Sequence, residues 1–348
     1  MSDPDMTHPA RWEFLEKMLL IRRFEEAVGT LANRKVFPGH YHLYIGQEAT
    51  GVGAMAALDE RDLITTTHRN HGHLLARGAD PTACLAEILG RSTGLNGGRG
   101  GTIHLSDPSL GFLSTSGVVG SVVGLAAGGG YACKQRNDGT LTAAFFGDGA
   151  LEEGIAFECL NIASLWSLPV IFICENNSAE AWGMAKGGYP TLVHASNDLR
   201  SIAGSLNIKA TRVEGIDPFA VHAAVMRAAE GCRNGNGPIF IEVMTKRWAG
   251  SAPLWPEMAT GITDLGMATG ATIIEDGPHR EWFEVQDPVL RLARQLMASE
   301  PDAIEKISTI DQRTTERVDA AARAAEHAPF PAVETASDHV FVPTREMS

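Results

Sequence analysis

The stretch Leu141-Thr-Ala-Ala-Phe-Phe-Gly147-Asp148-Gly149-Ala150 is followed by residues 151–167 and then by Leu168-Pro-Val-Ile-Phe-Ile-Cys-Glu-Asn176-Asn177. Residues 151–167 carry apolar side chains at helical spacing on one face, at Leu151, Ile155, Cys159, Ile162 and Trp166. The order predicts a strand, a turn, a helix and a second strand, which a right-handed crossover makes parallel. If the two strands are also adjacent, about 4.8 Å apart, Asp148 and Asn177 emerge at the same carboxyl edge of the sheet.

Carboxylate and amide oxygens that meet at one edge suit Mg²⁺, which usually shares its ligand shell with waters and phosphates. Gly147 and Gly149 permit close backbone approach, and a helix that begins near Ala150 offers free N–H groups to anionic oxygens. The alternative is a tight turn in which Asp148 only caps the helix, with an Asn-Asn turn after the second strand. The residues of this stretch leave both interpretations open.

The rest of the chain alternates helical patterns with short apolar runs and glycine-rich connections. We expect helices over 9–31, 48–58, 81–89, 116–131, 287–297 and 314–325, a strand over 62–67, and loops over 33–46 and 96–101. Such alternation predicts a doubly wound α/β fold, a mainly parallel sheet with helices on both faces. We predict an exposed tail over 1–10, one α/β domain over 11–285, and a helical extension and tail over 286–348.

Composition excludes several classes of protein. The 348 residues are 44% hydrophobic, and 29 Lys and Arg face 42 Asp and Glu, a net charge of −13, so nucleic-acid binding is not expected. Five widely spaced cysteines without a C-x-x-C favour reduced thiols in the cytoplasm. Residues 1–10 lack the apolar segment of a secretory signal, and no apolar run reaches the ~20 residues that a membrane span needs.

Five further motifs occur in a characteristic order. They are Ile45-Gly-Gln-Glu-Ala49, His68-Arg-Asn-His-Gly-His73, Gly97-Gly-Arg-Gly-Gly-Thr-Ile-His104, Gly117-Val-Val-Gly120 and Cys174-Glu-Asn-Asn177. With Gly147-Asp148-Gly149, and Asn177 at 29 positions after Asp148 (177 − 148), the chain resembles the α subunit of two-chain, thiamin diphosphate-dependent 2-oxo acid dehydrogenase E1 enzymes. The resemblance runs from about Arg11 to the Pro-containing tail, and the wording around His71 is most similar to acetoin dehydrogenase α subunits.

The resemblance implies a thiamin diphosphate-binding fold and a set of cofactor contacts. The Mg²⁺ ligands would be Asp148, Asn177 and the backbone carbonyl of Ala179. The diphosphate would be contacted by His68, by Arg69 and by the backbone of Gly149 and Ala150, and the aminopyrimidine by backbone groups of Gly117 and Val119.

Several histidines are candidates for proton transfer, because imidazole titrates near neutral pH. The resemblance makes His71 the better catalytic candidate, as a group that faces the thiazolium and the substrate, and His73 a second one. His104 has an active-site or a structural role with equal weight. His40 and His42 lie in a loop and carry no usable signal.

The resemblance also implies partners. Glu48 is a possible carboxylate for the pyrimidine nitrogen, but it is as easily structural, and in the family that glutamate belongs to a separate β subunit. We therefore expect an α₂β₂ heterotetramer and, as a further partner, a lipoylated E2 acyltransferase.

One position departs from the family pattern. Where the family has a histidine after Tyr-Arg-(aromatic)-x-Gly, this chain has Ser251, which cannot act as an imidazole. The nearby Trp248 and Trp255 either wall a larger substrate pocket or pack on the surface. We expect an E1-type dehydrogenase acting on acetoin, pyruvate or a related 2-oxo acid or α-diketone.

Three other interpretations stay open. A two-chain carboligase or transketolase-like lyase would use the same cofactor without lipoamide. A catalytically silent family member would serve assembly or regulation. An unrelated doubly wound nucleotide binder would lack the E1 chemistry altogether, although the chain has no G-x-G-x-x-G after a first strand to support this.

Overall fold

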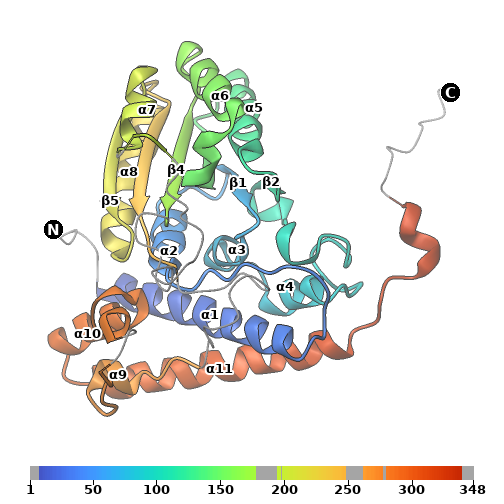
Figure 1. Ribbon diagram of the computed structural model, residues 1–348, viewed down its shortest axis with the longest axis vertical. Coiled ribbons are helices and arrows are strands. Elements are labelled where there is room, and N and C mark those ends of the chain that lie inside the picture. The colour runs from blue at the N-terminus through green and yellow to red at the C-terminus, as the bar shows by residue number, and fades with distance from the viewer. Residues whose placement is uncertain (1–7, 178–193, 197, 248–261, 277–279, 339–348) are drawn as a thin grey trace.

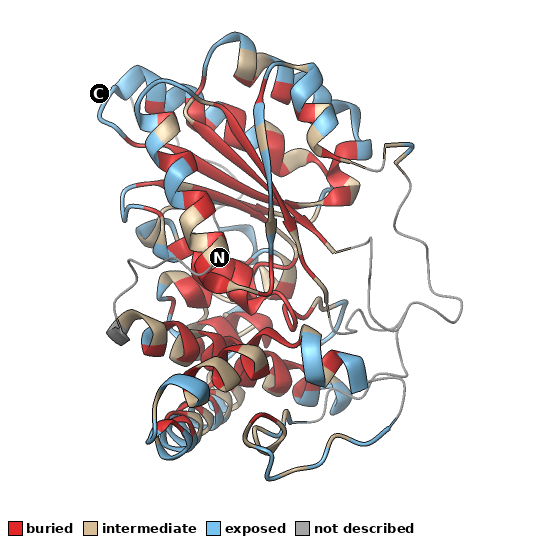
Figure 2. Ribbon diagram, turned by 90° about the vertical axis from the view of Figure 1, so that its left-hand side faces the viewer, coloured by how far each residue is buried: buried red, intermediate tan, exposed pale blue. Residues whose placement is uncertain are grey.

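The computed structural model describes residues 8–177, 194–196, 198–247, 262–276 and 280–338. Their centre is a six-stranded, all-parallel sheet in the order β2-β1-β3-β4-β6-β5 (Figure 1). The strands are β1 (Leu63–Thr67), β2 (Phe112–Ser116), β3 (Thr142–Gly147), β4 (Val170–Asn176), β5 (Lys209–Glu214) and β6 (Ile239–Met244). The central strands are buried along their length, as Figure 2 shows.

Helices cover both faces of this sheet. The longer helices are α1 (His8–Asn33), α2 (Glu48–Ala56), α3 (His71–Arg77), α4 (Pro81–Ile88), α5 (Ser121–Arg136), α6 (Gly154–Leu165), α7 (Arg200–Ser205), α8 (Pro218–Arg233), α10 (Pro288–Ser299) and α11 (Ala303–His327), with the short α9 (Gly266–Thr269). Successive strand residues point to opposite faces, so Phe145 packs in the core with α1, α2, α3 and α8. Phe146 packs in a second core with α5, α6 and α7. The predicted doubly wound α/β fold is confirmed.

The C-terminal helices form part of one packed layer with the N-terminal helix. Figure 1 shows α11 running beside α1 across the lower part of the view, with α10 at one end. Buried side chains of α10 and α11 belong to the same core as α1, α2 and α4. The helical character predicted for the C-terminal segment is confirmed, and the proposed boundary at 285/286 stays a prediction. None of the described helices combines the length and apolar character needed to cross a membrane.

Three predicted helices differ from the structure, and one of them, expected over 314–325, extends over Ala303–His327. The helix expected over 116–131 begins only at Ser121, because residues up to Ser116 belong to β2 and Gly120 turns the chain at φ 81°. The helix expected near Ala150 begins at Gly154, and Asp148–Glu152 form a 3₁₀ turn. The N-cap positions of this turn and of α6 are Gly147 and Glu153, so Asp148 is the N-cap of neither.

The face that α6 buries is not the stripe of apolar residues seen at helical spacing in the sequence. Ala156, Leu160 and Ala163 pack into the core, whereas the side chains of Ile155 and Trp166 are 42% and 49% exposed. Small alanines let α6 approach α5 and the sheet closely, and this packing outweighs the larger apolar area on the opposite stripe. The outward stripe of large apolar residues therefore remains accessible in this chain.

A buried arginine on α1 joins this helix to α2 and to the start of α10. Arg22 on α1, 1% exposed, donates from Nε to Glu48 Oε1 at 2.6 Å and from Nη1 to Asp287 Oδ2 at 2.7 Å. Asp287 in turn caps α10 by accepting from the backbone N–H groups of Val289 and Leu290. Burial raises the pKa of Glu48, against the lowering effect of Arg22. This ion-pair network ties α1, α2 and α10 together.

Replacing this arginine should destabilise the chain most at high pH. We expect Arg22→Met to lower the free energy of unfolding at pH 8 by about 3–5 kcal/mol, because two buried carboxylates lose their cation. A carboxyl group whose pKa is higher in the folded state contributes less to the stability of the protein as pH rises. Because Arg22 lowers the pKa of Glu48, its removal leaves a carboxyl group that is more readily protonated, so the loss of stability should be smaller at pH 5. Urea unfolding at both pH values measures this difference.

The matched control is Arg313→Met, which removes an exposed pair with Glu16 at 2.6 Å. It should change the unfolding free energy by about 1 kcal/mol or less. Equal losses at pH 5 and pH 8 for Arg22→Met would contradict the electrostatic interpretation of the network.

Candidate active site at the carboxyl edge of the sheet

The two halves of the Asp148–Asn177 pair come from adjacent strands. β3 and β4 pair in parallel with Gly147 opposite Glu175, so the residues that follow each strand emerge side by side. Asp148 is 4% exposed and Asn177 is half-buried. The adjacency that the sequence analysis required is confirmed. In open α/β sheets, ligands bind outside the carboxyl ends of the strands, which is where this pair lies.

The other predicted contacts follow neighbouring strands at the same edge. His68 and Arg69 come directly after β1, and Gly117 comes directly after β2. A Cβ added to Gly117 would lie 3.6 Å from His104 Cε1, so the His104 ring borders this turn. Val119 is 46% exposed. The family resemblance placed these residues at the site, and the sheet brings their backbones to one edge.

The remaining predicted positions are of two kinds. Gly149 and Ala150 lie in the 3₁₀ turn after β3, where Ala150 is buried and a Cβ added to Gly149 would meet nothing within 4 Å. The backbone of this turn is thus open to a close ligand. Four positions lie outside the described residues, namely Ala179, Trp248, Ser251 and Trp255.

A cluster of basic groups surrounds this edge. The rings of His42 and His68 are 4.3 Å apart, and Arg69, 6% exposed, donates to the carbonyl of Leu43. Burial, with the positive charges of the neighbouring arginines, lowers the pKa of His42 to about 2 and that of His68 to about 4. Burial and the charge of Arg247 lower the pKa of Arg69 to about 9.

Arg247 completes the cluster from the end of β6. Burial lowers its pKa, and the charge of Asp148 acts in the opposite direction. Basic groups that lower one another's pKa form a site whose positive charge an anion would neutralise. The sequence analysis gave no role to His42 or Arg247. Arg247 follows a strand of the sheet, and that position is a usable signal, whereas His42 reaches the site from a loop.

His71 lies at the start of α3 and is fully buried. Its Nδ1 is 3.1 Å from both carboxylate oxygens of Glu25, and its Nε2 is 3.0 Å from Thr102 Oγ1 and 3.1 Å from the Thr102 carbonyl. Both ring nitrogens are therefore engaged. The long-range partner Glu25, from α1, carried no sequence signal.

His73 is also fully buried and engaged at both nitrogens. Its Nδ1 is 2.8 Å from Thr66 Oγ1, and its Nε2 is 3.0 Å from the Tyr44 hydroxyl. Tyr44 donates its hydroxyl hydrogen to Glu175 on β4, and burial raises the Tyr44 pKa well above its usual value. A Cβ on Gly72 would lie 2.0 Å from the Tyr44 ring, so this glycine is required for the packing. His73 thus lies within a buried polar network behind the edge.

The carboxylate of Glu48 is not free, because it already has partners. It is fully buried, pairs with Arg22, and accepts a hydrogen bond at 2.8 Å from the backbone N–H of Gly46. Of its two predicted roles, the structural one agrees with these contacts.

Within the described residues there is no group of three or more His, Cys, Asp or Glu side chains arranged to hold a metal ion. A cation at this edge would need amide or backbone oxygens besides Asp148.

The fold and the edge define an α/β protein with basic groups gathered beyond the carboxyl ends of its strands. Residues 16–253 match the Dehydrogenase E1 component family. A pyruvate dehydrogenase E1 component subunit alpha from Zymomonas mobilis is 37% identical over 343 residues, 97% of this chain and 91% of the relative. The subunit alpha of an acetoin:2,6-dichlorophenolindophenol oxidoreductase from Bacillus subtilis is 37% identical over 322 residues, 92% of this chain and 90% of the relative.

The corresponding acetoin subunit from Cupriavidus necator is 35% identical over 328 residues, 94% of this chain and 92% of the relative. The chain therefore belongs to the dehydrogenase E1 component family, as an α subunit of the 2-oxo acid dehydrogenase type. The resemblance predicted from the motifs is confirmed. The two relatives at 37% carry pyruvate and acetoin names respectively, so identity alone favours neither substrate.

The basic cluster makes a measurable prediction. We expect Arg247→Met to weaken binding of inorganic diphosphate about 10- to 100-fold, because a hydrogen bond to a charged group contributes roughly 1.5–3 kcal/mol. The pKa of His68 should rise from about 4 towards its usual range, because the arginine charge lowers it now. Titration calorimetry and NMR titration of the imidazole resonances measure the two effects.

The control is Arg61→Met, which changes a 64% exposed arginine that precedes β1 at the opposite end of the strand. It should leave both quantities unchanged. Wild-type diphosphate affinity in Arg247→Met would remove this arginine from the site.

Proposed function

We propose that this chain is the α subunit of a thiamin diphosphate-dependent E1-type dehydrogenase. The enzyme would cleave the C–C bond next to a carbonyl of acetoin, pyruvate or a related 2-oxo acid or α-diketone, and pass the acyl group to an acceptor such as lipoamide. The observation that carries the proposal is the basic cluster beside Asp148 and Asn177, in a chain of this family. The carboligase alternative is not favoured, because the relatives are named dehydrogenase and oxidoreductase subunits.

The residues at the edge fit the cofactor that the family uses. Four basic groups suit a diphosphate, and a carboxylate beside an amide oxygen suits Mg²⁺. We propose that Asp148, Asn177 and the Ala179 carbonyl bind Mg²⁺, and that His68, Arg69 and the backbone of Gly149 and Ala150 bind the diphosphate. Gly117 and Val119 would contact the aminopyrimidine through backbone groups. When bound, thiamin diphosphate supplies the nucleophilic carbon that attacks the substrate carbonyl.

We propose His71 as the catalytic imidazole nearest the reacting groups and His73 as a second one. Glu25 accepts a hydrogen bond from His71 Nδ1, and this fixes the tautomer. Nε2, which now contacts Thr102, is then the nitrogen available to hold or release a proton once a ligand replaces that contact. Such rearrangement on ligand binding is common, since catalytic hydrogen bonds tighten only in the complex.

Two variants should separate the role of Asp148 in metal binding from the role of His71 in proton transfer. Asp148→Ala should abolish the Mg²⁺ dependence of thiamin diphosphate binding by the assembled enzyme. His71→Ala should keep the cofactor bound but lower kcat about 10²-fold or more. Calorimetric titration of the cofactor and steady-state kinetics measure the two effects. Mg²⁺-dependent binding that survives in Asp148→Ala would remove the metal assignment, and near-normal turnover in His71→Ala would make that residue structural.

A separate β subunit is the partner that this arrangement requires. Glu48 is engaged by Arg22, so we propose that the carboxylate acting on the pyrimidine comes from the β subunit of an α₂β₂ heterotetramer. A lipoylated E2 acyltransferase is the proposed acyl acceptor. Ser251 in place of the family histidine means that transfer would depend on other groups. A cytoplasmic location agrees with the five free cysteines.

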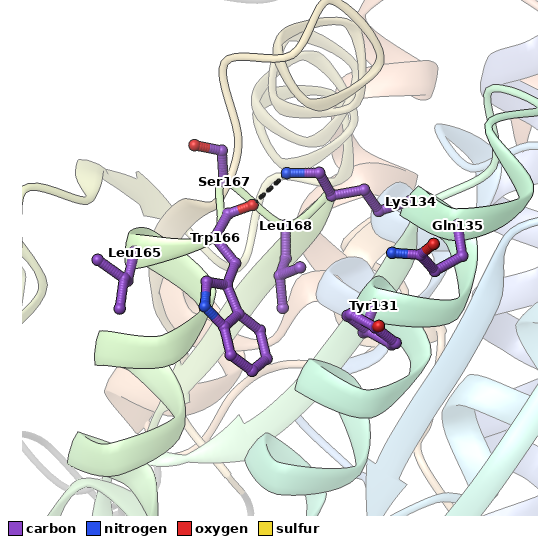
Figure 3. Close-up of a pocket in the computed structure, with 7 residues that line it drawn as sticks. All are labelled: Tyr131, Lys134, Gln135, Leu165, Trp166, Ser167 and Leu168. Carbon is purple, nitrogen blue, oxygen red and sulfur yellow. Dashed lines mark hydrogen bonds between the residues drawn. The ribbon is translucent and has the colours of Figure 1, made fainter.

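The surface for the β subunit is suggested by an apolar face on α5 and α6. This face consists of exposed Tyr131, Ile155, Leu165 and Trp166. It continues from the loop that holds exposed Val118 and Val119, beside the proposed cofactor contact. Figure 3 shows its far end, where Tyr131 and Trp166 border a pocket and Lys134 donates to the Trp166 carbonyl. Contiguous exposed apolar area of this kind marks protein interfaces.

A mild pull-down of the chain from its native cells, with mass spectrometry, tests the proposal. We expect an E1 β chain together with a lipoylated acyltransferase. A β chain without any lipoyl protein would support the lyase, and no β chain would support a silent family member. Ile155→Asp should lose the β chain because it places a charge in the apolar face, whereas Val333→Asp, at an 85% exposed site on the C-terminal 3₁₀ turn, should retain it. Retention of the β chain by Ile155→Asp would exclude this face.

A further inference from the structure

Gln47 lies directly before α2 and its side chain is fully buried. Its backbone is fixed from both sides, because its N–H donates to the Tyr44 carbonyl at 3.0 Å and its carbonyl accepts from Thr50 and Gly51. Its side-chain Oε1 accepts a hydrogen bond of 2.9 Å from Asn177 Nδ2. A rigid segment that precedes α2 thus reaches the amide that follows β4.

This contact decides which end of the Asn177 amide is free. An amide carries a donor end and an acceptor end, and only the oxygen can bind a cation. With Nδ2 engaged by Gln47, Oδ1 is the atom left for the site. The preceding Asn176 is used differently, since its Nδ2 donates to Glu242 Oε1 at 2.9 Å on the neighbouring strand. Of the two asparagines, the one oriented by Gln47 is the one proposed to bind metal.

The other end of the Gln47 amide supplies a second observation. Gln47 Nε2 is buried and has no hydrogen-bond partner among the described residues. A buried donor without a partner costs roughly 1–3 kcal/mol, so such a group requires an explanation, and an acceptor oxygen from a bound water or an ion's shell supplies one. Nε2 shares its carbon with Oε1 and therefore lies close to the Asn177 amide. A water oxygen in the shell of a bound cation would accept from it.

We infer that Gln47 is a positioning residue for the metal site, which orients Asn177 through Oε1 and donates to an oxygen of the cation's shell through Nε2. The inference rests on the proposed cofactor site. Partners that orient metal ligands typically contribute 10- to 100-fold to metal affinity. The residue acts through Asn177 and needs no contact with the substrate.

The decisive experiment is a double-mutant comparison on the enzyme assembled with its β chain. Gln47→Leu should raise the Mg²⁺ concentration for half-maximal thiamin diphosphate binding about 10- to 100-fold. In an Asn177→Asp background, most of this effect should disappear, because both carboxylate oxygens can bind the cation and need no orientation. A simple loss of packing would give the same change in both backgrounds. Gln312→Leu, at an exposed glutamine on α11, is the control and should change nothing.

A metal-free measurement keeps the test decisive if Asn177→Asp binds poorly. Affinity for inorganic diphosphate in the presence of EDTA should be the same in wild type and Gln47→Leu, because the basic cluster is unchanged. A loss in EDTA as large as that with Mg²⁺ would overturn the positioning role. Wild-type behaviour of Gln47→Leu with Mg²⁺ would overturn it while leaving the proposed function intact. Absence of any Mg²⁺ effect in the wild-type enzyme would instead reject the metal site itself.

Discussion

The parallel pairing of β3 with β4 is the constraint on which the site depends. Six register pairs, from Thr142 opposite Val170 to Gly147 opposite Glu175, fix the relative height of the two strand ends. A shift by one residue would send their side chains to the opposite faces and separate Asp148 from Asn177. The other strands add groups to the same edge at heights fixed by the same ladder. The position of the site is therefore a consequence of sheet geometry rather than of the loops around it.

Charge is distributed unevenly about this edge. The whole chain carries a net charge of −13, yet His42, His68, Arg69 and Arg247 gather where the strands end. Burial and mutual repulsion keep the two histidines neutral, so the cluster holds less positive charge than its composition suggests. An anion that enters would favour protonation of these groups, and affinity would increase with each proton taken up. Without a ligand, the neutral histidines keep the electrostatic repulsion within the cluster small.

Motif spacing could predict the contents of the site because parallel strands deliver residues to one edge in a known way. Asp148 and Asn177 were placed in this manner, whereas His68, Arg69 and Gly117 were placed by the family resemblance, and all five follow strands at the same edge of the sheet. Partners from outside the sheet could not be predicted. Glu25 reaches His71 from α1, 46 positions away, and only the packed tertiary structure brings them together.

The buried face of α6 could not be predicted because two criteria conflict along that helix. Ile155, Cys159 and Ile162 form a helical stripe, which normally indicates the core. The structure instead buries Ala156, Leu160 and Ala163, since the space between α6, α5 and the sheet is narrow. A stripe that satisfies the helical pattern without reaching the core of its own chain indicates a second surface to be covered. Ile155 on this stripe belongs to the apolar face on which the proposed β subunit would pack.

The buried glutamates behind the edge lead to the same conclusion. Glu25 is engaged by His71, Glu48 by Arg22, and Glu175 by Tyr44 and His73. Each of these carboxylates already has a hydrogen-bond partner. If the carboxylate turned away to serve a cofactor, its present partner would be left buried without that hydrogen bond. A carboxylate able to change its protonation during catalysis must then come from outside this set. In the proposed enzyme, this chain would supply the cations and the metal-binding oxygens of the active site, and the remaining acid would belong to the β subunit.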